Sequence, residues 1–210
     1  MDERETEVRS EFQVERIAFF SDAVFAIAIT LLVLDVDVPH LGREAGEAAL
    51  MQALLDQIPK ILGFVVSFLV VGTYWTSHHR FFRWIQGYDQ ALVWRNLLFL
   101  LAVSFIPFPT AVLSENGAQR ASLLLYAASL ILVGVAQASV VRHVRKHEGL
   151  RHPETPPGEL ALIQRRAWTA PVLCCLAIVL SFVSLTAARL TLVAIPLAVR
   201  FSQGRSSVRK

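Results

Sequence analysis

The chain has 210 residues, of which 54% are hydrophobic, and its mean hydropathy is +0.50. The apolar residues are gathered in long blocks with few charges, whereas a soluble globular protein distributes them by helical or strand period. The basic residues behind the formal net charge of +3 lie mostly in the short connections between these blocks. Composition and charge therefore exclude a soluble nucleic-acid-binding protein and predict an all-α integral membrane protein.

Six segments are apolar enough to cross the hydrocarbon core, which takes roughly 20 residues of helix. The N-terminal arm, residues 1–15, is polar and acidic rather than basic, so we expect the first apolar segment to remain as a span and not to be a signal peptide. The last two segments are separated only by Ala187, Ala188 and Arg189, which predicts a tight helical hairpin. The predicted spans are residues 18–38, 58–77, 91–113, 122–141, 168–186 and 190–201.

The first span carries the strongest polar signal, with Arg16, Phe20, Ser21 and Asp22 at its start. A charged residue at the centre of a span costs about 2.5–3.5 kcal/mol, and less near an interface, so Asp22 is expected to have a partner. Arg16 lies six positions away on a different helix face, so that partner should come from another helix or subunit. Stabilisation of Asp22 by the helix dipole alone remains an alternative.

Further along this span, four residues repeat at helical spacing and form one narrow stripe. Periodicity leaves the role of the stripe open, because the lipid-facing and packed faces of a membrane helix are both apolar. The one hydroxyl within it could also bond its own backbone. The stripe consists of Ile27, Thr30, Leu31 and Leu34.

The second span ends with Trp75, His78 and His79, which lie on neighbouring helix faces. This end lies on the same side of the membrane as the start of the first span, so we expect His78 or His79 to be able to pair with Asp22. Asn96, at the start of the third span, is another candidate partner. A metal site and a pH sensor remain open as alternatives, but adjacent histidines point in divergent directions, so we predict no metal site.

Basic residues set the expected orientation. Sixteen of the 20 Lys and Arg lie in or at the edges of the N-terminal arm, the second and fourth connections and the C-terminal tail, and four lie on the opposite side. This bias predicts an even number of spans with both termini in the cytoplasm. The basic stretch from Arg142 to Arg151 favours a topology signal, with binding of anionic lipid headgroups as an alternative, and the proline-rich residues 152–158 predict an irregular linker.

The motif Arg16-x-x-x-Phe20-Ser21-Asp22 at the cytoplasmic start of the first span resembles the signature of the transmembrane protein 175 family of potassium channels. The chain length and the six-span unit agree with that family. The resemblance implies a homotetramer around a central pore that the first helix of each subunit lines. It further implies a hydrophobic constriction at Ile27 and a hydroxyl ring for potassium preference at Thr30, with the apolar lining extended by Leu31 and Leu34.

The same resemblance implies that the signature holds the first helix against its neighbours and does not contact the ion. Its members here are Arg16, Phe20, Ser21 and Asp22. A bracing cluster is implied beside this segment, formed by Trp75, His78, His79 and Asn96.

The expected function is therefore a potassium channel with modest selectivity over sodium. Rings of aliphatic side chains can close a pore by dewetting, but they offer an ion no replacement for its lost water. We assign residues 16–203 to the channel domain and residues 204–210 to a cytoplasmic basic tail. The expected partners are potassium ions, the lipid bilayer and other copies of the chain, without nucleic acid, in the plasma membrane of a bacterium or archaeon.

Two other functions stay open. A proton- or ion-coupled secondary transporter would use Asp22 and the His78/His79 cluster, although such transporters tend to show inverted repeats and interrupted helices. A non-conducting membrane scaffold would carry no flux. We find no nucleophile elbow, His-Glu-x-x-His helix or phosphate-binding glycine loop, so neither an enzyme nor a cofactor is expected.

Overall fold

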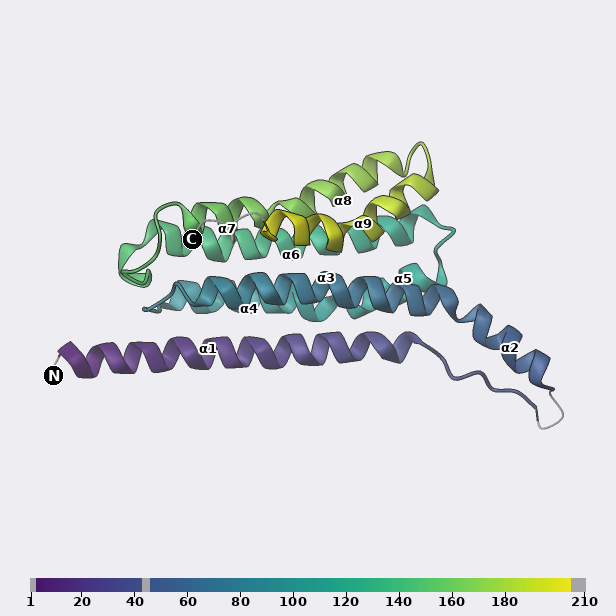
Figure 1. The fold of residues 1–210 in the computed structure, drawn as a ribbon, viewed down its shortest axis with the longest axis horizontal. Coiled ribbons are helices and arrows are strands. Elements are labelled where there is room, and N and C mark those ends of the chain that lie inside the picture. Colours follow the sequence, from purple (N-terminus) through teal and green to yellow (C-terminus); the bar gives the residue numbers. More distant parts are fainter. Residues whose placement is uncertain (1–2, 43–45, 205–210) are drawn as a thin grey trace.

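The computed structural model describes residues 3–42 and 46–204, and the regular elements in these ranges are helical apart from one isolated β-bridge. Figure 1 shows three layers: α1 alone along one side, α3 and α4 in the middle, and α6 to α9 beyond them. The bundle follows from long apolar helices that bury their faces against one another. The helices are α1 (Glu3–Leu31), α2 (Glu47–Asp56), α3 (Ile58–Phe82), α4 (Gln90–Phe105), α5 (Pro107–Glu115), α6 (Arg120–Lys146), α7 (Glu159–Ala167), α8 (Thr169–Leu180) and α9 (Leu185–Gly204).

Five helical segments in the described part of the chain are long and apolar enough to cross a membrane. The prediction of an all-helical, multi-pass membrane protein is therefore confirmed. The ninth helix holds Arg189 and Arg200 and is not one of the five. The segments are Phe12–Asp35, Ile58–Phe82, Gln90–Glu115, Arg120–Lys146 and Glu159–Leu180.

Two of these segments contain helix breaks with a local cause. The segment that begins at Gln90 is divided after Ile106, where Pro107 takes the first position of α5. Proline has no amide hydrogen to donate, so a helix start is the position at which it costs least. Helices α7 and α8 follow one another with only Trp168 between them, so the fifth span begins nine residues earlier than the predicted residue 168.

The predicted position of the last hairpin is wrong. Helix α8 ends at Leu180 and α9 begins at Leu185, so the turn occupies residues 181–184 and the predicted loop of residues 187–189 lies inside α9. The cause is a cap: the Ser184 hydroxyl accepts a hydrogen bond from the amide of Ala187 at 3.3 Å. Ala187 and Ala188 then continue the helix, as strong helix formers do.

Two further elements differ from the sequence-based expectation. Helix α1 begins at Glu3, so within the described residues the N-terminal arm is helical and continuous with the first span. A short helix, α2, stands between the first two spans at the far end of the bundle (Figure 1). The basic tail lies outside the described residues except for Gly204.

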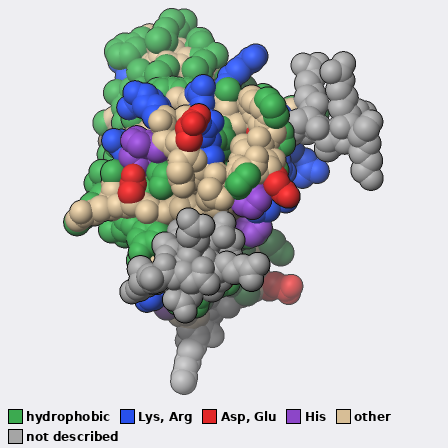
Figure 2. Space-filling view, turned by 90° about the vertical axis from the view of Figure 1, so that its left-hand side faces the viewer, with side chains coloured by type: hydrophobic (Ala, Val, Ile, Leu, Met, Phe, Trp, Pro, Cys, Tyr) green, Lys and Arg blue, Asp and Glu red, His purple; other side chains and the backbone are tan. Residues whose placement is uncertain are grey.

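The centre of the bundle is α6, whose buried row meets helices on several sides. It lies close to α8, because a Cβ atom on Gly134 would lie 2.2 Å from the Cγ of Pro171. At one end of the bundle the α3–α4 loop pairs with the α6–α7 loop through an antiparallel bridge between Ile85 and Arg151. Lys, Arg and His side chains gather on this end (Figure 2), where α6 ends in a turn that holds His143, Arg145 and Lys146.

Candidate functional site

Helix α1 has one buried face and one exposed face. The buried residues are spaced by seven, four, three and four positions, which keeps them on one side of the helix. They pack against α3 and α4, the two helices of the middle layer (Figure 1). The buried set is Val14, Ser21, Phe25 and Ala28 of α1 and Leu32 of the short 3-10 helix (Leu32–Asp35) that continues it and also holds Leu34.

The predicted pore stripe lies on the other face. Ile27 is 59% exposed and Leu34 is 73% exposed, and Thr30 and Leu31 are exposed beside them. The Thr30 hydroxyl donates to the carbonyl oxygen of Ile27 at 2.9 Å. Its proton is thereby used within the helix, while the lone pairs of its oxygen remain available to a hydrogen-bond donor or a cation on the exposed face.

An apolar hollow of about 350 Å³ adjoins this stripe, between α1 and α4. Ile27 and Leu31 form its α1 wall with Phe20 and Val24, and Leu97, Leu100 and Leu101 form most of its α4 wall. A single copy of the chain therefore leaves a continuous apolar surface uncovered along α1 and α4.

The signature residue Ser21 belongs to a buried polar network that joins three helices. Its hydroxyl donates to the carbonyl oxygen of Ile17 at 2.8 Å and accepts from the Asn96 amide at 2.9 Å. The other side of the Asn96 amide, its oxygen, lies 3.0 Å from Nε2 of His78. His78 is 3% exposed and stacks on the rings of Phe82 and Phe99.

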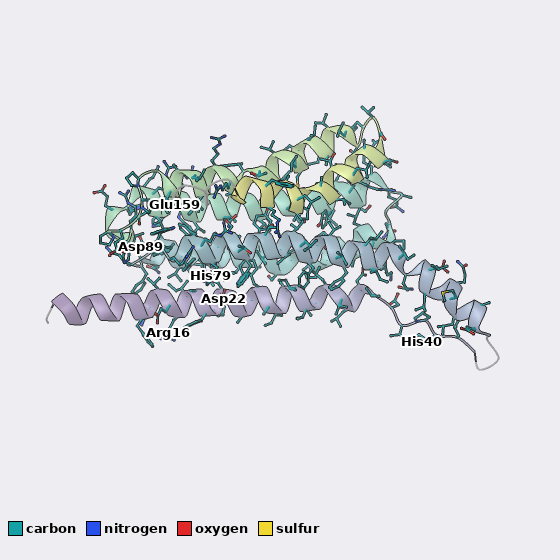
Figure 3. All side chains as sticks on the ribbon, viewed as in Figure 1. Arg16, Asp22, His40, His79, Asp89 and Glu159 are labelled. Carbon is teal, nitrogen blue, oxygen red and sulfur yellow. The ribbon has the colours of Figure 1, made fainter. Side chains whose placement is uncertain are left out.

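Asp22 is bound by a tryptophan and not by a histidine. The indole Nε1 of Trp75 donates to Oδ1 of Asp22 at 2.8 Å. The expected pairing of Asp22 with His78 is absent, because His78 is turned into the helix interface toward Asn96. His79 lies beside Trp75, with ring centroids 5.6 Å apart, and Figure 3 shows Asp22 and His79 between α1 and α3.

The remaining signature residues lie outside this network in a single chain. Arg16 is exposed and points away from the bundle (Figure 3), with its guanidinium 6.0 Å from the ring of Phe12. Phe20 is 54% exposed, on the same side as the stripe. The structure thus brings together Ser21, Asp22, Trp75, His78, His79 and Asn96, and it does not bring Arg16 and Phe20 to them.

One polar cluster at the basic end was not foreseen from the sequence. Asp89 caps α4 by accepting from the amide of Leu92 at 2.6 Å, and its Oδ2 lies 2.8 Å from Nε2 of His143 on α6. Burial raises the pKa of Asp89, but the hydrogen bonds from Leu92 and His143 outweigh it, so this pKa lies below its ordinary value. The available sequence signal was an aspartate directly before an apolar helical run.

The residues described above hold helices together and leave an apolar face of α1 exposed, and they form no arrangement typical of a reactive site. In the described ranges, no group of three or more His, Cys, Asp and Glu side chains is placed to hold a metal ion. The polar side chains of Ser21 and Asp22 on α1 are hydrogen-bonded to Asn96 on α4 and Trp75 on α3, and Asn96 also bonds His78 on α3.

A family model described as "Endosomal/lysosomal potassium channel TMEM175" matches residues 16–107. A protein named as a potassium channel from Streptomyces collinus is 43% identical over 127 residues, which cover 59% of this chain and 59% of that relative. A protein named as a potassium channel from Chamaesiphon minutus is 33% identical over 181 residues, which cover 85% of this chain and 89% of that protein.

The fold is also similar to a solved structure. The crystal structure of a lysosomal potassium-selective channel TMEM175 homolog from Chamaesiphon minutus superposes with a TM-score of 0.77 at 30% sequence identity. The alignment covers 91% of this chain and 99% of that one.

Proposed function

The chain belongs to the family of the endosomal/lysosomal potassium channel TMEM175, and on that premise we propose that it conducts potassium ions passively, with modest preference over sodium, across a bacterial plasma membrane. The relatives named as potassium channels and the similar solved fold support potassium as the ion.

The proposed assembly is a homotetramer of six-span subunits with both termini in the cytoplasm. Helix α9 is the sixth span, and it returns the chain from the α2 end of the bundle toward the end at which α1 begins (Figure 1). The excess of basic residues in the connections at that end supports a cytoplasmic location for it.

The observation that carries the proposal is the exposed apolar stripe on α1. One face of α1 is buried in its own bundle, while Ile27, Leu31 and Leu34 are left uncovered on the other. Copies arranged with this face toward a common axis would enclose a pore with an apolar lining. Ile27 would form its constriction, and closure would result from dewetting of the aliphatic rings.

Thr30 is the one polar group of the stripe, and we assign potassium preference to it. Its hydroxyl proton is bound to the Ile27 carbonyl, so a ring of Thr30 oxygens would present lone pairs toward the axis. A few hydroxyl oxygens replace a hydration shell only in part, which makes the ion that dehydrates more easily the favoured one. The selectivity should therefore be modest.

The signature segment is proposed to fix the position of α1 and not to contact the ion. Ser21 and Asp22 are held by Asn96 and Trp75, and Asn96 is held in turn by His78. Arg16 and Phe20, which are exposed in one chain, would bind a neighbouring subunit.

The alternative of a coupled carrier depends on Asp22 and the His78/His79 pair as ion- or proton-binding groups. The geometry favours a structural role for them, because His78 is enclosed by Phe82 and Phe99 and Asp22 is bound to Trp75. A carrier would have to break these contacts in each cycle.

The test is potassium, sodium and proton flux through the purified full chain in liposomes, with the variants Ile27→Asn and Leu34→Ala. We expect passive potassium flux without a counter-ion gradient, and both variants should change its size or its ratio to sodium flux. Matched controls are Val172→Asn and Leu176→Ala on α8, which are 62% and 47% exposed in the wild type but lie in the layer far from α1.

Equal effects of the stripe and control variants would exclude α1 as the pore lining. Potassium flux that requires an opposing proton gradient would identify a carrier. An absence of wild-type flux under all gradients would leave only the scaffold.

A further inference from the structure

We propose that the chain binds an anionic phospholipid at the α2 end of the bundle, in a cavity between α3, α5, α6 and α9 with Arg189 at its rim. The cavity has a volume of about 330 Å³, which lies within the range of small-ligand pockets. It lies among the membrane-spanning segments, and no residue of α1 lines it.

The walls of the cavity suit an acyl chain. Leu62 and Val66 of α3, Leu113 of α5, and Leu192 and Val193 of α9 contribute apolar side chains. Leu62 is 58% exposed and Val193 is 52% exposed, so the cavity is open on the side of these two helices. A groove among spanning helices that opens away from α1 faces lipid, provided that α1 stands at the centre of the assembly as proposed above.

The deep end of the cavity is polar but internally bonded. The Ser67 hydroxyl lies 3.0 Å from the Tyr126 hydroxyl and 2.9 Å from the Thr110 hydroxyl, which also bonds the Ile106 carbonyl. These groups need no partner from a ligand, because each already has one in the protein. An apolar chain end can therefore lie against them without leaving a buried polar group unsatisfied.

The rim carries a cation without a carboxylate partner. One guanidinium nitrogen of Arg189 donates to the carbonyl oxygen of Gly117, while its Nε is buried with no hydrogen-bond partner. In the described part of the chain no carboxylate forms an ion pair with Arg189, whereas Lys60 binds Asp37 and Glu115 at 2.6 and 3.2 Å. A phosphate supplies the acceptor oxygens that this guanidinium lacks.

A second arginine provides a matched comparison. Arg120 lies at the same end, where its Nε donates to the carbonyl oxygen of Ser181 at 3.1 Å and its guanidinium lies 4.7 Å from the ring of Phe182. Both arginines thus tie a turn of the bundle, but only Arg189 lines the cavity. Loss of a turn contact alone should affect both in the same way, whereas loss of lipid binding should affect Arg189 only.

The experiment titrates phosphatidylglycerol into the purified full chain in detergent and follows the midpoint of thermal unfolding. In Arg189→Gln we expect the lipid concentration for half-maximal stabilisation to rise about tenfold, because a charge-assisted hydrogen bond to the phosphate is lost. In Val193→Trp we expect a rise of about the same size, because the indole ring fills the mouth of the cavity. Arg120→Gln and Val183→Trp, at a residue that is 86% exposed, should leave it unchanged.

Equal losses of lipid affinity in test and control variants would overturn the proposed site. Unchanged lipid affinity in both test variants would also overturn it and would place the lipid at the basic loops instead. Stabilisation by phosphatidylcholine to the same extent would show that the site does not select an anionic lipid and would overturn that part of the proposal. Stabilisation by inorganic phosphate alone would show that the ligand is a soluble anion and not a lipid. The readout is binding and not flux, so it stands apart from the test of conduction.

Discussion

At the scale of single residues, the Asn96 side chain holds together the signature segment and the second span. It is 1% exposed, donates to Ser21 and bonds His78, so it satisfies two buried polar groups at once. Both of those groups lie on other helices, which makes Asn96 the link between α1, α3 and α4.

We expect Asn96→Leu to lower the free energy of unfolding by roughly 1–3 kcal/mol, because two buried polar groups lose their partner. The measurement is thermal unfolding of the purified protein in detergent. Ser104→Ala on the same helix is the control, since the Ser104 hydroxyl is exposed and bonds only its own helix carbonyl at Leu101. A change in Asn96→Leu no larger than in the control would show that the network contributes no stability.

Trp75 binds the acidic residue of the signature, Asp22. We expect Trp75→Phe to keep the ring but leave Asp22 without its 2.8 Å indole donor, which should destabilise the contact between α1 and α3 and change potassium flux. The same liposome assay measures it, with Trp94→Phe as the control because Trp94 is 60% exposed on α4. Wild-type flux and stability in Trp75→Phe would mean that this bond does not position α1.

At the scale of the elements, the crossing of α6 and α8 depends on a missing side chain. A Cβ atom on Gly134 would meet the Pro171 ring at 2.2 Å, and a proline ring in a helix cannot move aside as a flexible side chain can. Close approach of this kind, through small residues, is a general basis of helix association in membranes.

We therefore expect Gly134→Ala to destabilise the protein by about 1–3 kcal/mol through forced separation of the two helices. Gly72→Ala on α3 is the matched control, because a Cβ atom there meets nothing within 4 Å. Alanine is the better helix former by about 1 kcal/mol, so the control should be neutral or stabilising. Equal unfolding midpoints for the two variants would refute the close crossing.

Asp89 and His143 join α4 and α6 at the basic end of the bundle, and this contact should depend on pH. The pKa of Asp89 is lowered in the folded protein, so its stabilising effect is present above its ordinary pKa and is lost as pH falls through the lowered one. Asparagine preserves the helix cap. We expect Asp89→Asn to be less stable than the wild type at about pH 6, with the difference shrinking below about pH 4.

Unfolding midpoints of the two proteins across this range provide the measurement. A difference that does not vary with pH would show that the charge of Asp89 plays no part in this contact.

At the scale of the whole molecule, the subunit is built around a helix that it covers on one side only. The uncovered face of α1, the hollow beside it and the apolar face of α4 all lie on the same side of the bundle. The proposed assembly of several copies accounts for this asymmetry, because neighbouring subunits would cover part of the α1 surface that a single chain leaves exposed.

We expect a cationic, membrane-impermeant thiol reagent to reduce potassium current in Leu34→Cys, because this position would face the water-filled mouth of the pore. In mixed assemblies, the fraction of current that resists the reagent should equal the fourth power of the wild-type fraction if one modified subunit blocks the tetramer. The wild type, with its own Cys174 and Cys175, is the control. A linear dependence on the wild-type fraction would indicate that each chain conducts alone.

The sequence by itself determined the membrane class, the family and most of the spans, because these depend on local properties. Blocks of apolar residues predict spans wherever they occur, and the signature Arg16, Phe20, Ser21 and Asp22 lies within residues 16–22. The all-helical membrane fold and the family are confirmed, while the pore-lining roles of Ile27, Thr30, Leu31 and Leu34 stay predictions. The exposure of these four residues agrees with the proposed roles without testing them.

Only the tertiary structure decided which side chains meet. Asp22 could have bonded His78, His79 or Asn96, and the packing of α3 against α1 brought Trp75 to it instead. The cavity at Arg189 likewise depends on where four helices converge, and the turn before α9 depends on the Ser184 cap. The physical reason is that burial is a local tendency that the sequence displays, whereas a hydrogen bond between helices requires the distance and direction that only the packed helices fix.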